Sequence, residues 1–125
     1  MSPRSQEFYD RARERLEAAR KNLNLGEYAV TVGVSYYAML YGARAALSER
    51  DLYAKTHRGT WHLLRQALRS EEAFPLELIN EAEELGELRE AADYDALVVE
   101  ERQAAHAVDS AERFLSALDE LLSAG

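Results

Sequence analysis

The spacing of apolar residues along the chain predicts five helices and no strands. Near the N-terminus, apolar side chains recur at steps of four, four, three and four residues, which places them on one helix face. These residues are Phe8, Ala12, Leu16, Ala19 and Leu23. Gly26 lies just beyond the pattern and is typical of a helix C-terminus. Because the opposite face is charged, we expect an amphipathic helix that is half exposed.

The second predicted helix runs from about Glu27 to Ser48 and has no charged side chain between Tyr28 and Ala43. A helix that is apolar on every side must be surrounded by protein. We therefore expect it to be the central helix of a bundle, with small residues that let neighbouring helices approach: Gly33, Ala38, Gly42 and Ala43. Arg44 follows in a part that should still be packed. A buried guanidinium needs an acidic partner, so we expect one on a neighbouring helix.

Three further helices follow. Thr56 is a suitable N-cap for a short helix with Trp61, Leu64 and Leu68 on its inner face. The stretch SEEAFPLEL should end that helix and start the next, because Pro75 is tolerated in a first helical turn. The inward residues of the last two helices should be Leu78, Ala82, Leu85 and Ala92, followed by Ala104, Val108, Ala111, Leu115, Leu118 and Leu122.

Short connections between long amphipathic helices favour antiparallel neighbours. The expected fold is all-α: an up-and-down four-helix bundle with one additional short helix. We expect a single domain over residues 1–125, with a core from about residue 6 to residue 122.

The composition narrows the classes of protein to consider. The chain has no cysteine, which excludes disulfides, thiolate metal sites and a cysteine nucleophile, and the plain expectation is a cytoplasmic protein. The uncharged run from Tyr28 to Ala43 is shorter than the about 20 residues of a membrane-spanning helix, so no membrane segment is expected. Histidines and glutamates lack metal-ligand spacing, so we expect neither a metal nor another cofactor.

Charge is distributed unevenly, although the net charge is −8. Residues 1–69 hold 12 Lys and Arg against 7 Asp and Glu, whereas residues 70–125 hold 3 against 16. One explanation is that basic and acidic helices lie side by side, or face each other across a self-association surface. The other is a local basic site for a phosphate-bearing partner.

Three blocks of sequence occur in an order and spacing that resemble one family. They are LNLGEYAVTVGVSYYAMLYGARAAL, then THRGTWHLL, then LREAADYD. Together they resemble the HEPN domain family, which comprises small helical-bundle proteins of bacteria and archaea. The resemblance extends from about Gln6 to Leu122.

The resemblance implies a bundle that dimerises and is often encoded beside a minimal nucleotidyltransferase in a toxin–antitoxin-like pair. Many relatives are metal-independent RNases that use an arginine followed, after four to six residues, by a histidine. An arginine can hold a phosphate while a histidine moves a proton. Here the arginine matches Arg89, but Tyr94 stands where the shortest motif has its histidine.

Because Tyr94 replaces the motif histidine, the sequence leaves open whether the protein is an enzyme. We favour an interaction module that dimerises, acts with a nucleotidyltransferase-type partner and can bind a nucleotide or RNA. The alternative is an RNase toxin of the same family, in which Arg89 is active and His57 or Tyr94 replaces the missing histidine.

Two groups of residues are candidates for a site. Arg89 and Asp93 are four residues apart and should form an ion pair on one helix face, whereas Tyr94 lies about 140° from Arg89 around the helix. The alternative role for these three is a remnant nucleotide or RNA phosphate site. His57 and Arg58 could hold an anion at a helix N-terminus. The competing interpretation is that His57 packs and hydrogen-bonds there while the cations stay solvated.

Overall fold

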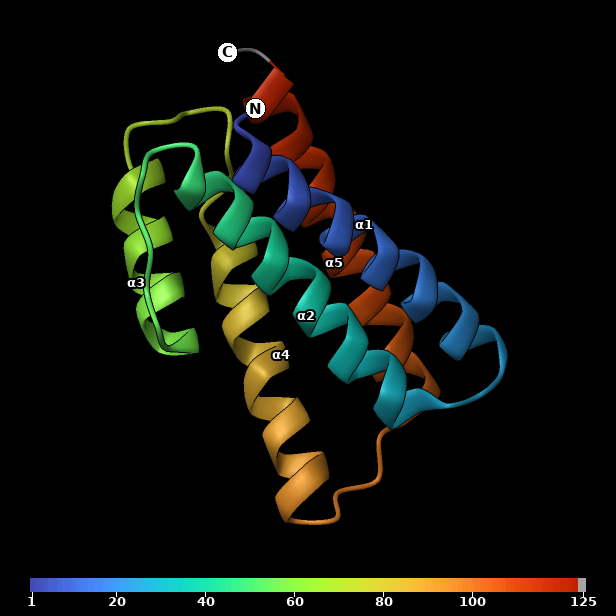
Figure 1. The fold of residues 1–125 in the computed structure, drawn as a ribbon. Coiled ribbons are helices and arrows are strands. Elements are labelled where there is room, and N and C mark those ends of the chain that lie inside the picture. Colours follow the sequence, from blue (N-terminus) through green and yellow to red (C-terminus); the bar gives the residue numbers. More distant parts are fainter. Residues whose placement is uncertain (124–125) are drawn as a thin grey trace.

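The fold consists of five helices joined by short connections (Figure 1). The computed structural model describes residues 1–123. The helices are α1 (Pro3–Asn24), α2 (Tyr28–Ser48), α3 (His57–Leu68), α4 (Glu77–Tyr94) and α5 (Glu101–Ser123). The four long helices alternate in direction, and the shorter α3 packs beside α2 and α4. The expected all-α bundle with one additional short helix is confirmed, and residues 1–123 contain no strand.

Helix α2 is central because it contacts each of the other four helices. Most of its side chains are buried. The prediction that neighbouring helices enclose it on all sides is wrong, because part of its surface stays uncovered. One stripe, here called the outer stripe of α2, is half-buried or exposed and consists of Val30, Val34, Tyr37 and Tyr41. Despite the apolar character of α2, no helix within residues 1–123 combines the length and hydrophobicity needed to cross a bilayer.

A glycine sets the close packing of α2 against α5. A Cβ atom at Gly42 would lie 2.7 Å from Leu115 Cδ2 and 3.0 Å from Leu118 Cδ1. Both leucines are fully buried, so they have little room to move away. The prediction that Gly42 lets a neighbour approach is therefore confirmed.

Aromatic rings fill the centre of the core at the α3 end of the bundle. Phe114 of α5 meets Trp61 and Phe74 edge-on, at centroid distances of 6.0 and 5.6 Å. Phe74 lies in the α3–α4 connection, where the sequence pattern gives no sign that a side chain is buried. The pattern instead predicts Phe8 inside, but Tyr9 is the buried ring and Phe8 is half-buried. Tyr9 tolerates burial because its hydroxyl donates to Asp119 Oδ1 at 2.7 Å.

The helix ends follow local sequence signals. Thr56 is the N-cap of α3, and its Oγ1 accepts a hydrogen bond of 2.9 Å from the Gly59 backbone N–H. Ser2 caps α1 in the same way through the backbone N–H of Ser5 at 3.1 Å. Gly26 follows α1 with φ of +76°, a conformation that a residue without a Cβ adopts at little cost. The predicted cap at Thr56 is confirmed.

Replacing Thr56 with alanine should lower the free energy of unfolding by about 1 kcal/mol, because a backbone donor at the start of α3 loses its acceptor. Urea denaturation followed by helical circular dichroism measures this change. Thr56→Ser is the matched control because it keeps the accepting oxygen. An equal loss in Thr56→Ser would show that the Thr56 methyl group, and not the cap, carries the effect.

Candidate functional site

Helices α2, α3 and α4 bring five side chains together into one cluster. This tyrosine–arginine cluster consists of Tyr36, Tyr37, His57, Trp61 and Arg89. The guanidinium carbon of Arg89 lies 5.5 Å from the centroid of each tyrosine ring, within the range of cation–π attraction. The His57 ring lies 5.7 Å from the same two centroids. Arg89 and His57 therefore share one pair of tyrosines.

The Tyr36 hydroxyl joins α2 to α3 through two hydrogen bonds. Trp61 Nε1 donates to it at 3.2 Å, and His57 Nδ1 lies 3.2 Å away on the other side. Because Trp61 donates to the oxygen, the hydroxyl hydrogen is left to donate to Nδ1 of a neutral His57. Burial raises the pKa of Tyr36, so the phenol stays protonated at neutral pH. The interpretation that His57 packs and hydrogen-bonds at the start of α3 is confirmed.

Arg89 is held at one end of this cluster and keeps unused donors. Its Nη1 donates to Asp93 Oδ2 at 3.2 Å, which confirms the ion pair expected from the four-residue spacing. The Arg89 side chain is 20% exposed, whereas that of Asp93 is 56% exposed. Arg89 Nε is buried and has no hydrogen-bond partner among residues 1–123. The Arg89 guanidinium thus lies over the Tyr36 and Tyr37 rings, and its Nε–H donor has no acceptor among residues 1–123.

Arg89 faces an open groove beside α2. The groove has a volume of about 330 Å³ and is lined by Arg15, Ala29, Val30, Gly33, Val34, Tyr37, Arg89 and Asp93. A Cβ at Gly33 would lie 3.7 Å from Arg89 Cγ, an ordinary contact distance. The small residues of α2 form an apolar floor, and the two arginines stand on opposite sides of it. Such a groove can accommodate an anion that also has an apolar part.

Arg44 differs from its sequence-based expectation. The side chain is half-buried, no ion pair joins it to a carboxylate in the described part of the chain, and its buried Nε has no hydrogen-bond partner there. The prediction of an acidic partner on a neighbouring helix is therefore wrong. The physical reason is that α2 is not fully enclosed at Arg44, so water can solvate part of the guanidinium.

Burial and the positive charges of Arg44 and Arg89 lower the pKa of His57. Burial has the largest effect, followed by Arg44 and then Arg89, and Glu90 has a smaller opposing effect. The imidazole is therefore neutral at pH 7, which agrees with its role as acceptor for the Tyr36 hydroxyl.

This depressed pKa predicts a pH dependence of stability. The unfolded chain takes up a proton at His57 near pH 6.5, whereas the folded chain resists it until a lower pH. The contribution is therefore present above about pH 6.5 and is lost as the pH falls through and below that value. We expect a smaller loss of stability between pH 7.5 and pH 5.5 in His57→Asn, whose amide oxygen can still accept from Tyr36. Urea denaturation at both pH values tests this, and identical pH slopes for the two proteins would contradict it.

The other predicted site residues lie outside the cluster. Tyr94 ends α4 and is 84% exposed, so it does not complete a motif with Arg89. Arg58 lines a shallow cavity of about 220 Å³ that three residues of the cluster also line: Tyr36, His57 and Trp61. Three carboxylates stand in the same cavity: Glu83, Glu87 and Glu90. Those carboxylates make the cavity a poor place for a phosphate. The sequence offered no sign that Tyr36 and Tyr37 belong to a site, because tyrosines on an apolar helix also occur in ordinary cores.

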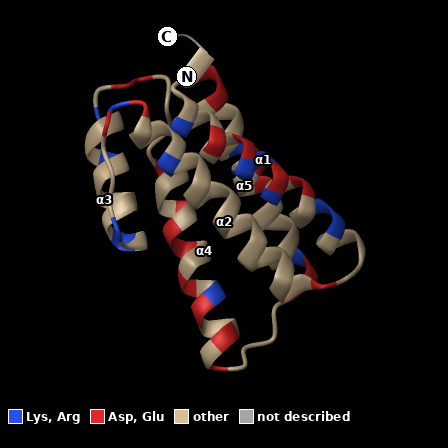
Figure 2. Ribbon diagram, in the orientation of Figure 1, with Lys and Arg blue, Asp and Glu red and all other residues tan. Residues whose placement is uncertain are grey.

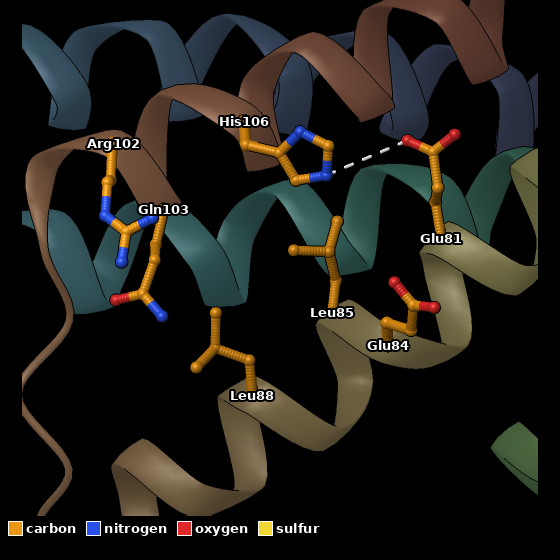
Figure 3. Close-up of a pocket in the computed structure, with 7 residues that line it drawn as sticks. All are labelled: Glu81, Glu84, Leu85, Leu88, Arg102, Gln103 and His106. Carbon is orange, nitrogen blue, oxygen red and sulfur yellow. Dashed lines mark ion pairs between the residues drawn. The ribbon is translucent and has the colours of Figure 1, made fainter.

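A second hollow lies between α4 and α5 and holds about 300 Å³ (Figure 3). Glu81 at its edge forms two hydrogen bonds with Arg113, at 2.6 and 3.2 Å, and accepts another from Ser110 Oγ at 2.6 Å. These partners hold the pKa of Glu81 below its usual value. Glu81 therefore joins α4 to α5. Across residues 1–123, no three or more His, Asp and Glu side chains are arranged to hold a metal ion.

Comparison with known proteins identifies related sequences over most of the chain. The HEPN domain model matches residues 5–121. UPF0332 protein glr0978 of Gloeobacter violaceus is 38% identical over 94 residues, which cover 75% of each chain. "Putative toxin MJ0142" of Methanocaldococcus jannaschii is 27% identical over 93 residues, covering 74% of this chain and 63% of that protein. A UPF0332 protein of Archaeoglobus fulgidus is 31% identical over 84 residues, covering 67% and 66%.

A solved structure has the same fold. TT1696 from Thermus thermophilus superposes with a TM-score of 0.79 at 23% sequence identity, covering 94% of this chain and 97% of the other. At that identity the likeness establishes the arrangement of the helices and nothing about the chemistry of the site.

Proposed function

Because this chain belongs to the HEPN domain family, we propose that it is the toxin-like member of a toxin–antitoxin-like pair and binds a phosphate-bearing molecule, a nucleotide or RNA, at Arg89. In this proposal it works as a homodimer together with a nucleotidyltransferase-type protein. The name of the Methanocaldococcus jannaschii relative supports the toxin-like assignment. The resemblance of the sequence to the family supports the dimer and the partner.

The position of Arg89 is the observation that carries the ligand assignment. Its guanidinium lies on the Tyr36 and Tyr37 rings and borders a groove with a second arginine, Arg15. Among residues 1–123 its one ion pair is with the exposed Asp93. A guanidinium fork matches the geometry of a phosphate group and can bind it with two hydrogen bonds. The tyrosine and valine side chains of the groove would contact a base or ribose.

Titration with AMP, and separately with single-stranded RNA of mixed sequence, tests this assignment. Trp61 is the only tryptophan and contacts Tyr36, so its fluorescence reports changes in the cluster. We expect binding that weakens about tenfold or more in Arg89→Ala, because a hydrogen bond to a charged group contributes on the order of 1.5–3 kcal/mol.

The matched control is Arg102→Ala, which removes the same charge from a side chain that is 80% exposed on α5. Its affinity should stay close to that of the unmodified protein. Absence of binding to both probes, or an equal loss in Arg89→Ala and Arg102→Ala, would refute the assignment.

One observation favours a second function, metal-independent RNA cleavage. His57 shares the tyrosine pair with Arg89, and its lowered pKa keeps it in the neutral form that accepts a proton. In this function Arg89 would stabilise charge on the phosphate, and a ribose hydroxyl would displace the Tyr36 hydroxyl from His57 Nδ1, the ring nitrogen without a proton, and transfer its proton to that nitrogen. His57, and not the distant Tyr94, is then the replacement for the missing histidine.

Incubation of the purified protein with mixed RNA in the presence of EDTA tests this second function. Cleavage should disappear in both Arg89→Ala and His57→Ala and persist in Tyr94→Phe. RNA that stays intact at protein concentrations sufficient for binding would refute the cleavage function and leave RNA or nucleotide binding as the remaining function. Cleavage that survives Arg89→Ala would instead indicate a contaminating nuclease.

A further inference from the structure

Two buried arginine Nε atoms lack a hydrogen-bond partner among residues 1–123. They belong to Arg44 and Arg89. Arg89 has one ion pair, with the exposed Asp93, whereas no carboxylate in the described part of the chain pairs with Arg44. Burying a donor without an acceptor lowers stability, and a ligand with acceptor oxygens would remove that cost at both arginines.

Arg44 continues the outer stripe of α2. It is the only charged residue between Tyr28 and Ser48, and Figure 2 shows this basic segment toward the C-terminal end of an otherwise uncoloured helix. Tyr37 and Arg44 are seven residues apart, which is close to two full turns, so both leave the helix on nearly the same side. Side chains of a helix also tilt toward its N-terminus, so Arg44 leans back toward Tyr37.

Arg89, His57 and Arg44 follow one another along this side of α2. The Arg89 side chain passes beside Gly33, and its guanidinium carbon lies 5.5 Å from the Tyr37 ring centroid. The His57 ring meets the Tyr37 ring edge-on at 5.7 Å. Arg44 comes about 10 Å further along the helix axis than Tyr37. In order along the helix, His57 thus falls between two guanidinium groups whose Nε donors lack acceptors.

The charge on His57 agrees with this order. Besides burial, which has the largest effect, the charges of Arg44 and Arg89 lower the pKa of His57. Both guanidinium groups therefore lie within electrostatic range of the imidazole ring.

Most carboxylates near His57 stand beyond Tyr36 and not on the Tyr37 side. Neither Tyr37 nor Arg44 lines the cavity that contains Glu83, Glu87 and Glu90, whereas Tyr36 does. Tyr37 instead lines the groove with Arg89, where Asp93 is the one carboxylate. An anion that approaches along the Tyr37 side therefore meets mainly arginines.

We propose that Arg44 holds a second phosphate, so that the ligand is a single strand of RNA with consecutive phosphates at Arg44 and Arg89 and the ribose between them at His57 and Tyr37. This inference rests on the phosphate site in the proposed function. It assigns the ligand of that site as a strand and not a mononucleotide.

The spacing of the arginines favours a strand over a nucleoside diphosphate. Gly33, beside Arg89, and Arg44 are about 16 Å apart along the helix axis. The two phosphates of a diphosphate share an oxygen atom, whereas a ribose separates consecutive phosphates of a strand. Sites for single strands also combine cations along the backbone with aromatic rings for the bases, and the outer stripe supplies Tyr37 and Tyr41.

Calorimetric titration with three adenine ligands at pH 8 tests the second phosphate. AMP has one phosphate, ApA has one phosphate between two nucleosides, and the dinucleotide pApA has two phosphates. At this pH His57 is neutral with or without the charge of Arg44, so an altered histidine charge does not contribute. We expect pApA to bind about tenfold or more tighter than AMP or ApA, because a hydrogen bond to a charged group is added.

Arg44→Ala should remove this advantage of pApA and leave the affinity for AMP close to that of the unmodified protein. Unchanged AMP binding also shows that the variant is folded. Arg89→Ala should weaken the binding of all three ligands. The matched control is Arg58→Ala, which removes the same charge next to His57 but from the cavity with the carboxylates, and its affinity for pApA should stay close to the original.

The salt dependence of binding to mixed single-stranded RNA gives a second measure. One phosphate contact on a single strand contributes about 0.7 to the slope of log affinity against log salt concentration. The slope should therefore fall by about 0.7 in Arg44→Ala and stay constant in Arg58→Ala.

Three results would overturn the second phosphate while leaving AMP bound at Arg89. The first is pApA that binds no tighter than AMP, or that loses equal affinity in Arg44→Ala and Arg58→Ala. The second is AMP that weakens equally in Arg44→Ala and Arg89→Ala, since both arginines would then hold one phosphate. The third is ADP that binds as tightly as pApA and depends on Arg44, which would assign a diphosphate. Absence of binding to AMP, pApA and mixed RNA alike would refute the proposed function together with this inference.

Discussion

Replacing Phe114 with alanine should lower the free energy of unfolding by about 3–5 kcal/mol, the usual cost of removing a fully buried aromatic ring. Phe114 is completely inaccessible and meets Trp61 and Phe74 edge-on. Its loss would leave a cavity between α5, α3 and the α3–α4 connection. Neither large ring can turn into this space without losing its own contacts. Urea denaturation of the two proteins gives the difference directly.

The matched control is Phe8→Ala, which removes the same ring from a half-buried position on α1. Its cost should be clearly smaller, because Phe8 stacks on Tyr41 at the surface and water can replace it. Trp61 fluorescence should change in Phe114→Ala and stay constant in Phe8→Ala. Equal costs for the two substitutions would show that the rings around Phe114 rearrange to fill the cavity.

Replacing Gly86 with alanine should destabilise the protein, although alanine favours helices. A Cβ at Gly86 would lie 2.8 Å from Tyr36 Cε1 and 3.2 Å from its Cζ. Tyr36 is buried and held by Trp61 and His57, so its ring cannot shift without weakening those contacts. The overpacking cost of about 1–3 kcal/mol exceeds the gain in helix propensity of about 1 kcal/mol. Unfolding in urea and the fluorescence of Trp61 measure the two effects.

Gly33→Ala is the comparison, because a Cβ at Gly33 meets only Arg89 Cγ and Cδ, at 3.7 and 3.8 Å. These are ordinary contacts, so the helix propensity of alanine should raise stability by up to about 1 kcal/mol. Opposite signs for the two glycines are the expected result. If both substitutions stabilise, Tyr36 is not fixed by its hydrogen bonds and the cluster is looser than the geometry implies.

The candidate site was visible in the sequence only in part. The ion pair of Arg89 with Asp93 follows from their four-residue spacing, and the contacts of His57 follow from its place at the start of a helix. No local pattern could show that Arg89 lies on Tyr36 and Tyr37, because those residues are more than fifty positions away. The prediction of an acidic partner for Arg44 was wrong for the same reason. It assumed that α2 is fully enclosed at Arg44, and that depends on where the other helices lie.

Local sequence patterns were enough to predict the five helices, most of their ends and most of their inner faces, because helix periodicity and capping act between residues only a few positions apart. They also limited the fold to a bundle, since amphipathic helices with short connections have few ways to bury their apolar faces. Local patterns could not predict which side of α2 stays uncovered, which arginines lack a carboxylate partner, or which rings support Arg89. Those features depend on distances between segments far apart in the chain, and the packing of whole helices sets them.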